Sequence, residues 1–323
     1  MVCLRIFSTA AAMCAAAACV AAPASAYPAK PIRLVVPLSA AGPADTVSRL
    51  IARKLTDSLG QSVVVDNRAG GSTIIGTEIV AHAPADGYTL LTITTTHAVN
   101  PSVFKKLPFD PVKDFAPVTL IEAAPFMLVA HPSVAANTLG ELIALARSRP
   151  GQINYGSAGN GSSQHLTTEL FKAAAKIDLV HIPYKGAGPA FIDLVAGQVQ
   201  VMFSSTVSSI AYVNNKQLRG LAVTSLKRLA VAPSLPTIAE SGFPGFESSS
   251  WVGMLAPAGT PQAVIERLHR EVAAALKSKD VVDTLAGIGA EPRGLPPAEF
   301  AAYYRGEMRK WAEVIRRGGI HLD

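Results

Sequence analysis

Short apolar runs and amphipathic stretches alternate through the first part of this chain. Runs rich in valine and leucine at 32–37, 62–66 and 88–94 have the length of buried strands and end at turn-forming residues. Between them, apolar residues recur at helical spacing over 44–59 and in a second stretch through Ile75. This order of strands and helices predicts a parallel sheet with crossover helices.

The same alternation returns in the middle of the chain. A capping box at Thr138–Glu141 predicts a helix start, because the threonine hydroxyl can accept a hydrogen bond from the N–H of Glu141. Further apolar runs predict strands at 119–123, 126–130, near 153–155, and at 179–183, 199–203 and 218–223. The repetition favours a second α/β lobe over one continuous sheet.

The last part of the chain returns to longer helices. A late strand is predicted at 251–256, and Pro261 and Pro297 mark helix starts, since proline is favoured in the first helical turn. The apolar stripes along these two helices are typical of core packing rather than of a partner surface.

The most informative stretch is the glycine-rich turn over 154–165. Its glycines allow the backbone to turn sharply and expose N–H groups, and Ser162 or Ser163 can cap the helix that follows. The first N–H groups of a helix have no internal partner, and the helix dipole favours negative charge there. The turn is therefore suited to hold a carboxylate or another small anion. Many α/β proteins have such a turn and bind nothing there, and this alternative stays open.

Two polar loops are expected at the carboxyl ends of the first strands, where ligands of such sheets bind. They cover 39–45 and 95–100 and consist mainly of small residues. Asp45 could contact a ligand amine or cap its own helix, and positional preference favours the cap. His97 could contact a ligand or be held by backbone hydrogen bonds, and the sequence favours neither.

Motifs of catalysis are missing from the sequence. The glycines of the turn fall as G-x-x-G-x-G without a following lysine, which excludes the P-loop and dinucleotide fingerprints, and no G-x-S-x-G elbow occurs. The seven histidines form no H-x-x-x-H pair, and Ser162 with His165 is too local for a catalytic triad. We therefore expect a binding protein without metal or cofactor rather than an enzyme.

Residues 1–26 are predicted to be a secretory signal. Arg5 precedes an alanine-rich apolar run, and Ala24-Ser25-Ala26 is a small-residue cleavage site, so the chain would be exported and its mature form would begin at Tyr27. All three cysteines lie in this segment, which leaves the mature chain without a disulfide or thiol. The formal net charge of +6 is spread along the chain without a basic run, so no nucleic-acid partner is expected.

Several short motifs occur in one order along nearly the whole chain. They are YPAKPIR at 27–33, the loop to Asp45, DGYTL at 86–90, the GSxGxGS pattern at 156–162, HL at 165–166, PYKG at 183–186, GQV at 197–199 and APAGTP at 256–261. The ordered set resembles the Bug receptors, the periplasmic solute-binding proteins of tripartite tricarboxylate transporters.

The resemblance implies a two-lobe periplasmic-binding-protein fold of type II, a Venus flytrap in which each lobe is a mostly parallel sheet flanked by helices. The chain would cross twice between lobe 1, residues 27–124 plus 249–323, and lobe 2, residues 125–248. Such receptors hold a small carboxylate or amino-acid-like ligand between their lobes and deliver it to membrane permease subunits. A monomer is expected.

The resemblance also implies which residues contact the ligand. They come from two loops of lobe 1 and three of lobe 2. Together with Asp45, they are Ser39, Ala40, Ala41, Thr96, His97, Ser157, Gly159, Ser162, Ser163, Tyr184, Lys185, Ser204 and Ser205.

The first loop departs from the family's P-F-x-x-G-G-x-x-D pattern. Leu38 replaces the aromatic residue, and Ala41 stands where the family often has glycine. The added Cβ requires the loop to adjust if φ is positive there.

Two other functional hypotheses stay open on the sequence. The loaded receptor could dock a membrane signalling protein as a ligand sensor instead of a permease. The third hypothesis is an exported α/β hydrolase, for which loss of ester hydrolysis on mutation of Ser162 would be diagnostic.

Overall fold

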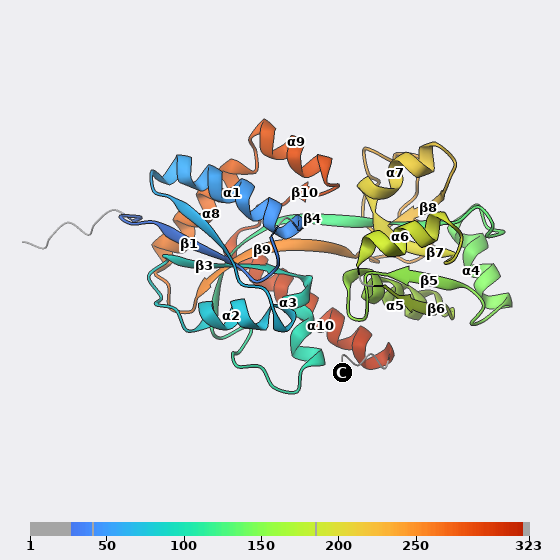
Figure 1. Cartoon of the computed structure of the whole chain (residues 1–323), viewed down its shortest axis with the longest axis horizontal. Coiled ribbons are helices and arrows are strands. Elements are labelled where there is room, and N and C mark those ends of the chain that lie inside the picture. The colour runs from blue at the N-terminus through green and yellow to red at the C-terminus, as the bar shows by residue number, and fades with distance from the viewer. Residues whose placement is uncertain (1–26, 41, 185, 319–323) are drawn as a thin grey trace, which may run out of the picture.

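Two β-sheets that share one long strand organise the chain, as a computed structural model shows (Figure 1). The structure describes residues 27–40, 42–184 and 186–318; the predicted signal segment at 1–26, Ala41 and Lys185 lie outside these ranges. No helix in the described ranges has both the length and the apolar character needed to cross a membrane.

The first sheet contains the three parallel strands predicted from the first apolar runs. β1 (Ile32–Val36) lies between β2 (Val63–Asn67) and β3 (Thr89–Thr94). β3 pairs antiparallel with β9 (Ser249–Pro257), and β9 pairs antiparallel with the first part of β4 (Phe115–Ala130). The short β10 (Glu291–Pro292) also pairs with β4.

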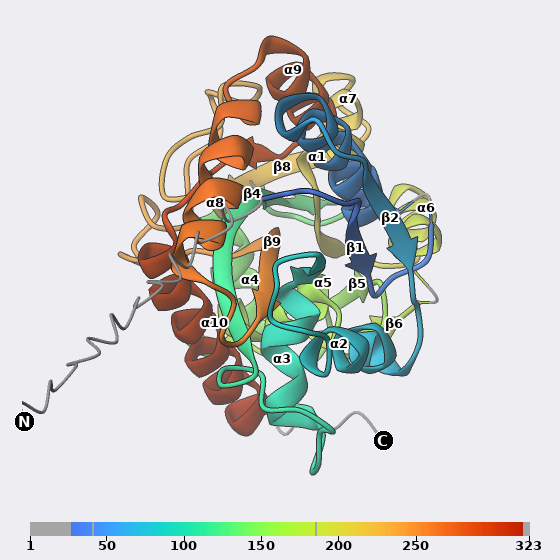
Figure 2. The ribbon, with the colours of Figure 1, turned by 90° about the vertical axis from the view of Figure 1, so that its left-hand side faces the viewer.

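Helices cover both faces of the first sheet (Figure 2). The helices on one face are α1 (Pro43–Leu59), α8 (Gln262–Ala275) and α9 (Lys279–Gly287). Those on the other face are α2 (Ile74–Ala81), which follows a 3-10 turn at Gly71–Thr73, α3 (Thr95–Val103) and α10 (Pro297–Gly318). Leu268 on α8 and Phe300 on α10 are fully buried, which confirms that the apolar stripes of these helices are core.

The second sheet repeats this arrangement with shorter elements. Its strands are β5 (Asn154–Ser157), β6 (Val180–Pro183), β7 (Val201–Ser205) and β8 (Arg219–Val223), of which β5 pairs in parallel with β6 and β7. Its helices are α4 (Leu139–Ser148), α5 (Ser163–Ala175), α6 (Ala187–Val195) and α7 (Thr206–Asn214). Separate apolar clusters fill the two sides of this sheet.

The strand β4 joins the two sheets. The sequence predicted two strands, at 119–123 and 126–130, but the structure has a single strand of 16 residues. Its partner is β9 as far as Pro125, and β7 and β8 from Phe126 onward. Proline has no N–H to donate, so it is tolerated at the point where one set of partners ends and the next begins. Hydrogen bonding therefore runs from sheet to sheet. Most of the packing on either side of Pro125 is separate, and Leu166 of α5 joins the cluster that contains Trp251 and Trp311.

The chain returns to the first sheet beside this crossing. The N–H of Phe126 donates to the hydroxyl of Thr224 at 2.8 Å, and the N–H of Ser248 donates to the carbonyl of Thr224 at 3.1 Å. Thr224 thus links both crossing segments. Figure 1 shows β4 and β9 running side by side between the two halves of the molecule.

Two local predictions have different outcomes. The capping box is confirmed, because the Thr138 side chain accepts a hydrogen bond from the N–H of Glu141 at 3.2 Å at the start of α4.

The expected loop at 95–100 is wrong, because these residues form the first turns of α3. Packing of α3 against α10 outweighs the weak helix propensity of its threonines, Asn100 and Pro101.

A buried carboxylate connects α10 to the strand that crosses between the sheets. Glu307 on α10 accepts hydrogen bonds from the indole N–H groups of Trp251 at 3.0 Å and Trp311 at 2.9 Å. It also forms an ion pair with Lys310. Both tryptophans are among the largest fully buried side chains, so this carboxylate orders the core beneath β9.

We expect Glu307→Ala to lower the free energy of unfolding by about 3 kcal/mol, because it leaves two buried indole N–H groups without an acceptor. Glu307→Gln retains an acceptor oxygen and should lower stability less. Chemical denaturation of the three proteins measures the difference, and equal stability of Glu307→Ala and the wild-type protein would contradict this role.

Candidate functional site

A cavity of about 760 Å³ lies where the two sheets meet. Its volume is in the range of sites for small molecules. The residues that line it from the first sheet and its helices are Leu38, Ser39, Gly42, Pro43, Ala44, Asp45, Thr94, Thr95, Thr96, Glu122, Ala124, Pro125, Ser250, Trp251, Val252, Gly287, Ile288 and Ala290. Those from the second are Phe126, Gly161, Ser163, Gln164, Ala187, Ser205, Val207 and Ser208.

Five helices, α1, α3, α5, α6 and α7, begin at this cavity, and the first or second residue of each lines it. Four of these helices have no side-chain cap at their first turn. Their N-cap residues are two glycines, Gly42 and Gly186, and two residues whose hydroxyls make no capping hydrogen bond, Thr94 and Ser205. Each helix start carries about half a positive elementary charge on its N–H groups. The cavity therefore lies at the positive ends of several main-chain dipoles.

The glycine-rich turn before α5 is folded back on itself. The N–H of Gly159 donates to the Ser157 hydroxyl at 3.1 Å, and the N–H of Gly161 donates to Nδ1 of His165 at 3.0 Å. Gly159 has φ +121°, a conformation that other residues rarely adopt. The Ser162 hydroxyl caps the helix by accepting from the N–H of His165 at 3.3 Å, which confirms Ser162 as the N-cap.

Two main-chain donors of this turn stay available. In the described part of the chain, the N–H groups of Ser163 and Gln164 have no hydrogen-bond partner, and both residues line the cavity. They occupy the first two positions of α5, where no intrahelical acceptor exists. The turn can therefore offer a pair of adjacent N–H groups to an anion.

A stack of aromatic rings supports the turn from behind. The imidazoles of His165 and His181 stack at 4.0 Å between centroids, and the ring of Tyr155 stacks on His181 at 4.8 Å. Nε2 of His181 lies 2.6 Å from the hydroxyl of Ser157. Burial lowers the pKa of both histidines to about 4, so both are neutral at pH 7. A neutral imidazole is required for Nδ1 of His165 to accept the N–H of Gly161.

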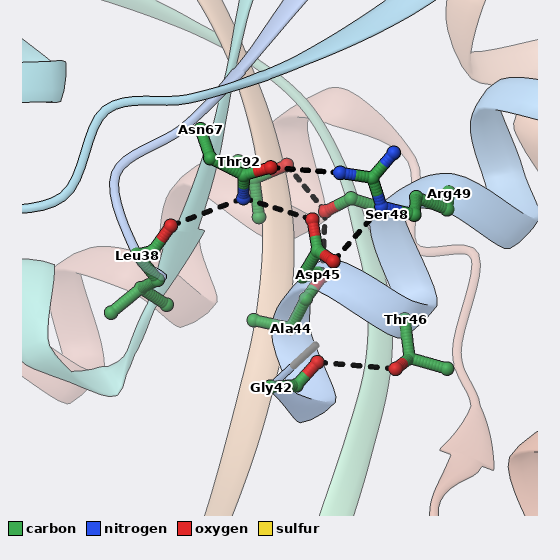
Figure 3. Close-up of polar contacts among 9 residues, drawn as sticks. All are labelled: Leu38, Gly42, Ala44, Asp45, Thr46, Ser48, Arg49, Asn67 and Thr92. Carbon is green, nitrogen blue, oxygen red and sulfur yellow. Dashed lines mark hydrogen bonds and ion pairs between the residues drawn. The ribbon is translucent and has the colours of Figure 1, made fainter. Parts of the chain in front are cut away.

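Asp45 holds the first loop in place (Figure 3). Its carboxylate accepts from Nε of Arg49 at 2.9 Å and from Nδ2 of Asn67 at 2.9 Å. The same Asn67 amide donates to the carbonyl of Leu38 at 3.1 Å, and Arg49 also donates to the Asn67 carbonyl at 2.8 Å. Asp45 lines the cavity, but it lies inside α1 rather than at the N-cap, which is Gly42. Its role in this geometry is to fix the path of the loop that carries Ser39.

His97 does not line the cavity, although the family resemblance implies a ligand contact from it. Its ring is 2% exposed and lies among the rings of Phe109, Phe115 and Tyr304. Neither ring nitrogen has a partner in the described part of the chain, and burial lowers the pKa of His97 to about 3. Since 95–100 is helical, Thr95 and Thr96 face the cavity while His97 points to the opposite side.

Tyr184 and Ser157 also face away from the cavity. The Tyr184 hydroxyl donates to Asp193 on α6 at 2.7 Å, and its ring packs in an apolar cluster of the second sheet. Ser157 is fully buried and shapes the turn through His181 and Gly159. These side chains build the site without lining it.

The other predicted residues differ in whether they line the cavity. Ser39, Asp45, Thr96, Ser163 and Ser205 line the main cavity together. Ser204 lines a smaller hollow of about 300 Å³ that shares Gln164, Ala187, Ser205 and Ser208 with it. Residues that do not line either space are Ala40, Gly159 and Ser162, while Ala41 and Lys185 lie outside the described residues.

Several cavity residues escaped the sequence reasoning. Thr95 was placed in a loop and given no contact, although its buried hydroxyl has no partner in the described ranges. Gln164 follows Ser163 at the helix start and could have been found from that position. Glu122 is a lone acid in the apolar run at 119–123, and this pattern could have marked it as a site residue. Nothing in the sequence around Trp251 indicates that it lines the cavity.

The lining is polar at the helix starts and mostly apolar elsewhere, with Glu122 on β4 as an exception. Asp45 and Glu122 are its only ionisable side chains within the described residues. The same residues contain no group of three histidine, cysteine or acidic side chains that could hold a metal ion. An anion in this cavity would thus be held by main-chain N–H groups and hydroxyls.

Comparison with known proteins agrees with this arrangement. Residues 47–320 match the family model described as the tripartite tricarboxylate transporter family receptor. Protein BugT of Bordetella pertussis (strain Tohama I) is 39% identical over 298 residues, which are 92% of this chain and 91% of BugT.

Two similar structures were solved with ligands. Rpa4515 of R. palustris, with adipate, has a TM-score of 0.76 and 39% identity, covering 91% of this chain and 99% of that one. MatC from Rhodopseudomonas palustris, with bound malate, has a TM-score of 0.72 and 32% identity, covering 90% of this chain and 100% of that one.

The two sheets, the shared crossing strands and the cavity between them define a two-lobe periplasmic-binding-protein fold. The chain belongs to the tripartite tricarboxylate transporter receptor family, the Bug receptors. The resemblance found in the short sequence motifs is confirmed.

We expect His97→Leu to leave the free energy of unfolding at pH 7 within about 1 kcal/mol of the wild-type value, because it removes two unpartnered ring nitrogens. The folded pKa of His97, about 3, lies below the unfolded value of 6.5, so its neutral form stabilises the fold above pH 6.5. That contribution is lost as pH falls from 6.5 to about 3. As pH falls through this window, the free energy of unfolding of His97→Leu should therefore decrease by about 1.4 kcal/mol less per pH unit than that of the wild-type protein.

Thermal and chemical denaturation at several pH values measures this slope. Ligand affinity should stay unchanged in His97→Leu. A large loss of ligand affinity in His97→Leu without loss of stability would show that His97 takes part in binding.

Proposed function

We propose that this protein captures a small carboxylated solute between lobe 1, residues 27–124 plus 249–323, and lobe 2, residues 125–248. It does so as a monomer in the periplasm, after removal of residues 1–26, and delivers the solute to the permease subunits of a tripartite transporter. The observation that carries the proposal is the meeting of five helix starts at one cavity.

The ligand carboxylate binds at the start of α5. The free N–H groups of Ser163 and Gln164 are adjacent donors, and a hydrogen bond to a charged acceptor contributes about 1.5–3 kcal/mol. Hydroxyls of Thr96 and Ser205 complete the polar lining. Adipate and malate in the structures of Rpa4515 and MatC support a carboxylate as the ligand class.

Ligand binding favours closure of the two lobes over the cavity. The lining comes from both lobes, so a closed state makes contacts that an open state cannot make, and this differential affinity drives the equilibrium. The crossing segments at Pro125–Phe126 and Ser248–Ser249 are the hinge, since hydrogen-bond partners change there. The bound form is then the one that the permease recognises.

Thermal-shift titration with mono-, di- and tricarboxylates tests the ligand class. A carboxylate at a hundredfold excess over its Kd should add about 2.7 kcal/mol to the free energy of unfolding. The protein should be unfolded and refolded first, so that a retained ligand is removed. Absence of stabilisation by every carboxylate would overturn the proposal.

A matched pair of variants tests the start of α5. Proline is tolerated at the first helical position but has no N–H, so Ser163→Pro removes one donor and keeps the helix. The preceding Ser162 already has φ −63° and ψ 155°, which suits a residue before proline. Ser163→Pro should weaken carboxylate binding about tenfold. Ser163→Ala keeps the N–H and should weaken it less; equal affinities in both variants would remove this amide from the site.

A further inference from the structure

Glu122 is the one acid of the cavity for which the structure gives no bonding partner. The side chain lines the cavity, the residue is 4% exposed, and Oε2 has no hydrogen-bond partner in the described ranges. A buried polar atom without a partner costs about 1–3 kcal/mol. Such an atom at the wall of a ligand cavity indicates a group kept for the ligand.

The strand register explains why Glu122 has no partner. On β4 it stands opposite Val252 of β9 on one side and Pro292 of β10 on the other. Neither side chain carries a hydrogen-bonding group, and proline also lacks an N–H. Ala124 follows two positions later on the same strand and lines the same cavity, as the period of a strand requires. Glu122 therefore lines the cavity from a strand position whose paired neighbours are apolar.

The charges near Glu122 do not hold it ionised. Burial is the largest influence and raises the pKa of Glu122 to about 8, while the positive charge of Arg293 lowers it in part. Arg293 also forms an ion pair with the carboxylate of Glu291 at 3.6 Å, which weakens the effect of its positive charge on Glu122. β9 carries no ionisable residue. The elements around the cavity and β4 carry further charged groups, and most of these are paired with one another. They include Asp45 on α1, bonded to Arg49, Lys54 on α1, paired with Asp280 on α9, Arg267 and His269 on α8, and Glu307 on α10, bonded to Trp251 and Trp311 and paired with Lys310.

The cavity also has apolar lining. Phe126, Trp251 and Ile288 belong to it, and they offer a surface to methylene groups rather than to charge. The site thus has two polar regions of different character. One is a set of main-chain donors, and the other is a neutral carboxyl group with one O–H to give.

We propose that Glu122 in its protonated form is the residue that recognises the far end of the ligand, by sharing one proton with a second carboxyl group. This inference rests on the proposed function, because it takes the first carboxylate to sit at the start of α5. The ligand it fits is a dicarboxylic acid with an apolar middle. On binding, the O–H on the partnerless oxygen of Glu122 donates to the distal carboxylate, and after the proton moves across, the same oxygen accepts from the O–H of the ligand.

The pH dependence of binding follows from this exchange. At pH 7 Glu122 carries its proton and donates to a carboxylate. Above about pH 8 the ionised Glu122 would face a second negative charge, so the dicarboxylate must bring a proton with it. Affinity for a dicarboxylate should therefore fall as pH rises past 8, while affinity for a monocarboxylate should not.

Isothermal titration calorimetry with matched acids tests the proposal. The probes are dicarboxylic acids from succinate to suberate and the monocarboxylic acid of each length. The wild-type protein should bind its best dicarboxylate about tenfold tighter than the matched monocarboxylate at pH 7. Titrations near pH 9 in buffers of different protonation enthalpy should show uptake of about one proton per dicarboxylate.

Two variants of Glu122 distinguish the effect of its titration from the effect of its hydrogen-bond donor. Glu122→Gln keeps a donor of the same size and should keep the preference for the dicarboxylate while losing its pH dependence. Glu122→Leu should lose the preference about tenfold and still bind the monocarboxylate. Thermal denaturation of both variants shows whether the fold is intact, and Glu122→Gln alone decides the pH dependence if Glu122→Leu does not fold.

Three results would overturn this role. The dicarboxylate could bind no tighter than the monocarboxylate, or Glu122→Leu could keep the preference. A zwitterionic amino acid could bind best, with affinity rising with pH, which would make Glu122 an ionised partner of an ammonium group. Failure of every mono- and dicarboxylate to bind is a different result, and it would reject the proposed function itself.

Discussion

The structure depends on where its helices begin. In a parallel α/β sheet every crossover helix starts at the carboxyl edge of a strand, so the main-chain N–H groups of several helices collect at one edge. Here that edge belongs to two sheets that face a common cavity, and helices of both sheets begin at it. Positive potential at the cavity thus comes from the fold itself, without a basic side chain in the described lining.

Side chains around the cavity mostly fix the backbone and leave its donors free. Asp45 holds the first loop through Asn67 and Arg49. His165 accepts the N–H of Gly161 and orders the turn before α5. This arrangement suits a receptor, because rigid loops keep their donors aimed at the ligand before it arrives. It also explains why residues that match the family motifs can lie behind the surface that meets the ligand.

Glu122 differs from these supporting residues, because one oxygen of its acid group has no hydrogen-bond partner in the described ranges. Its position on β4 puts it on the strand that crosses between the lobes, beside the residues where pairing changes. A contact there would link the chemistry of the ligand to the strand that we propose as part of the hinge. Selectivity for the ligand and closure of the lobes would then both depend on β4.

The sequence by itself determined most of the fold and the family. Apolar periodicity located the strands of both sheets, the capping box located α4, and the glycine-rich turn identified the start of α5. Local patterns of this kind carry these features because backbone conformation depends on neighbouring residues. Only the tertiary structure decided which side chains face the cavity. Thr95 faces the cavity while His97, two positions on and turned by about 200° around α3, lies in the core. Glu122 owes its burial to Val252 and Pro292, which are distant in sequence and meet it only through strand pairing.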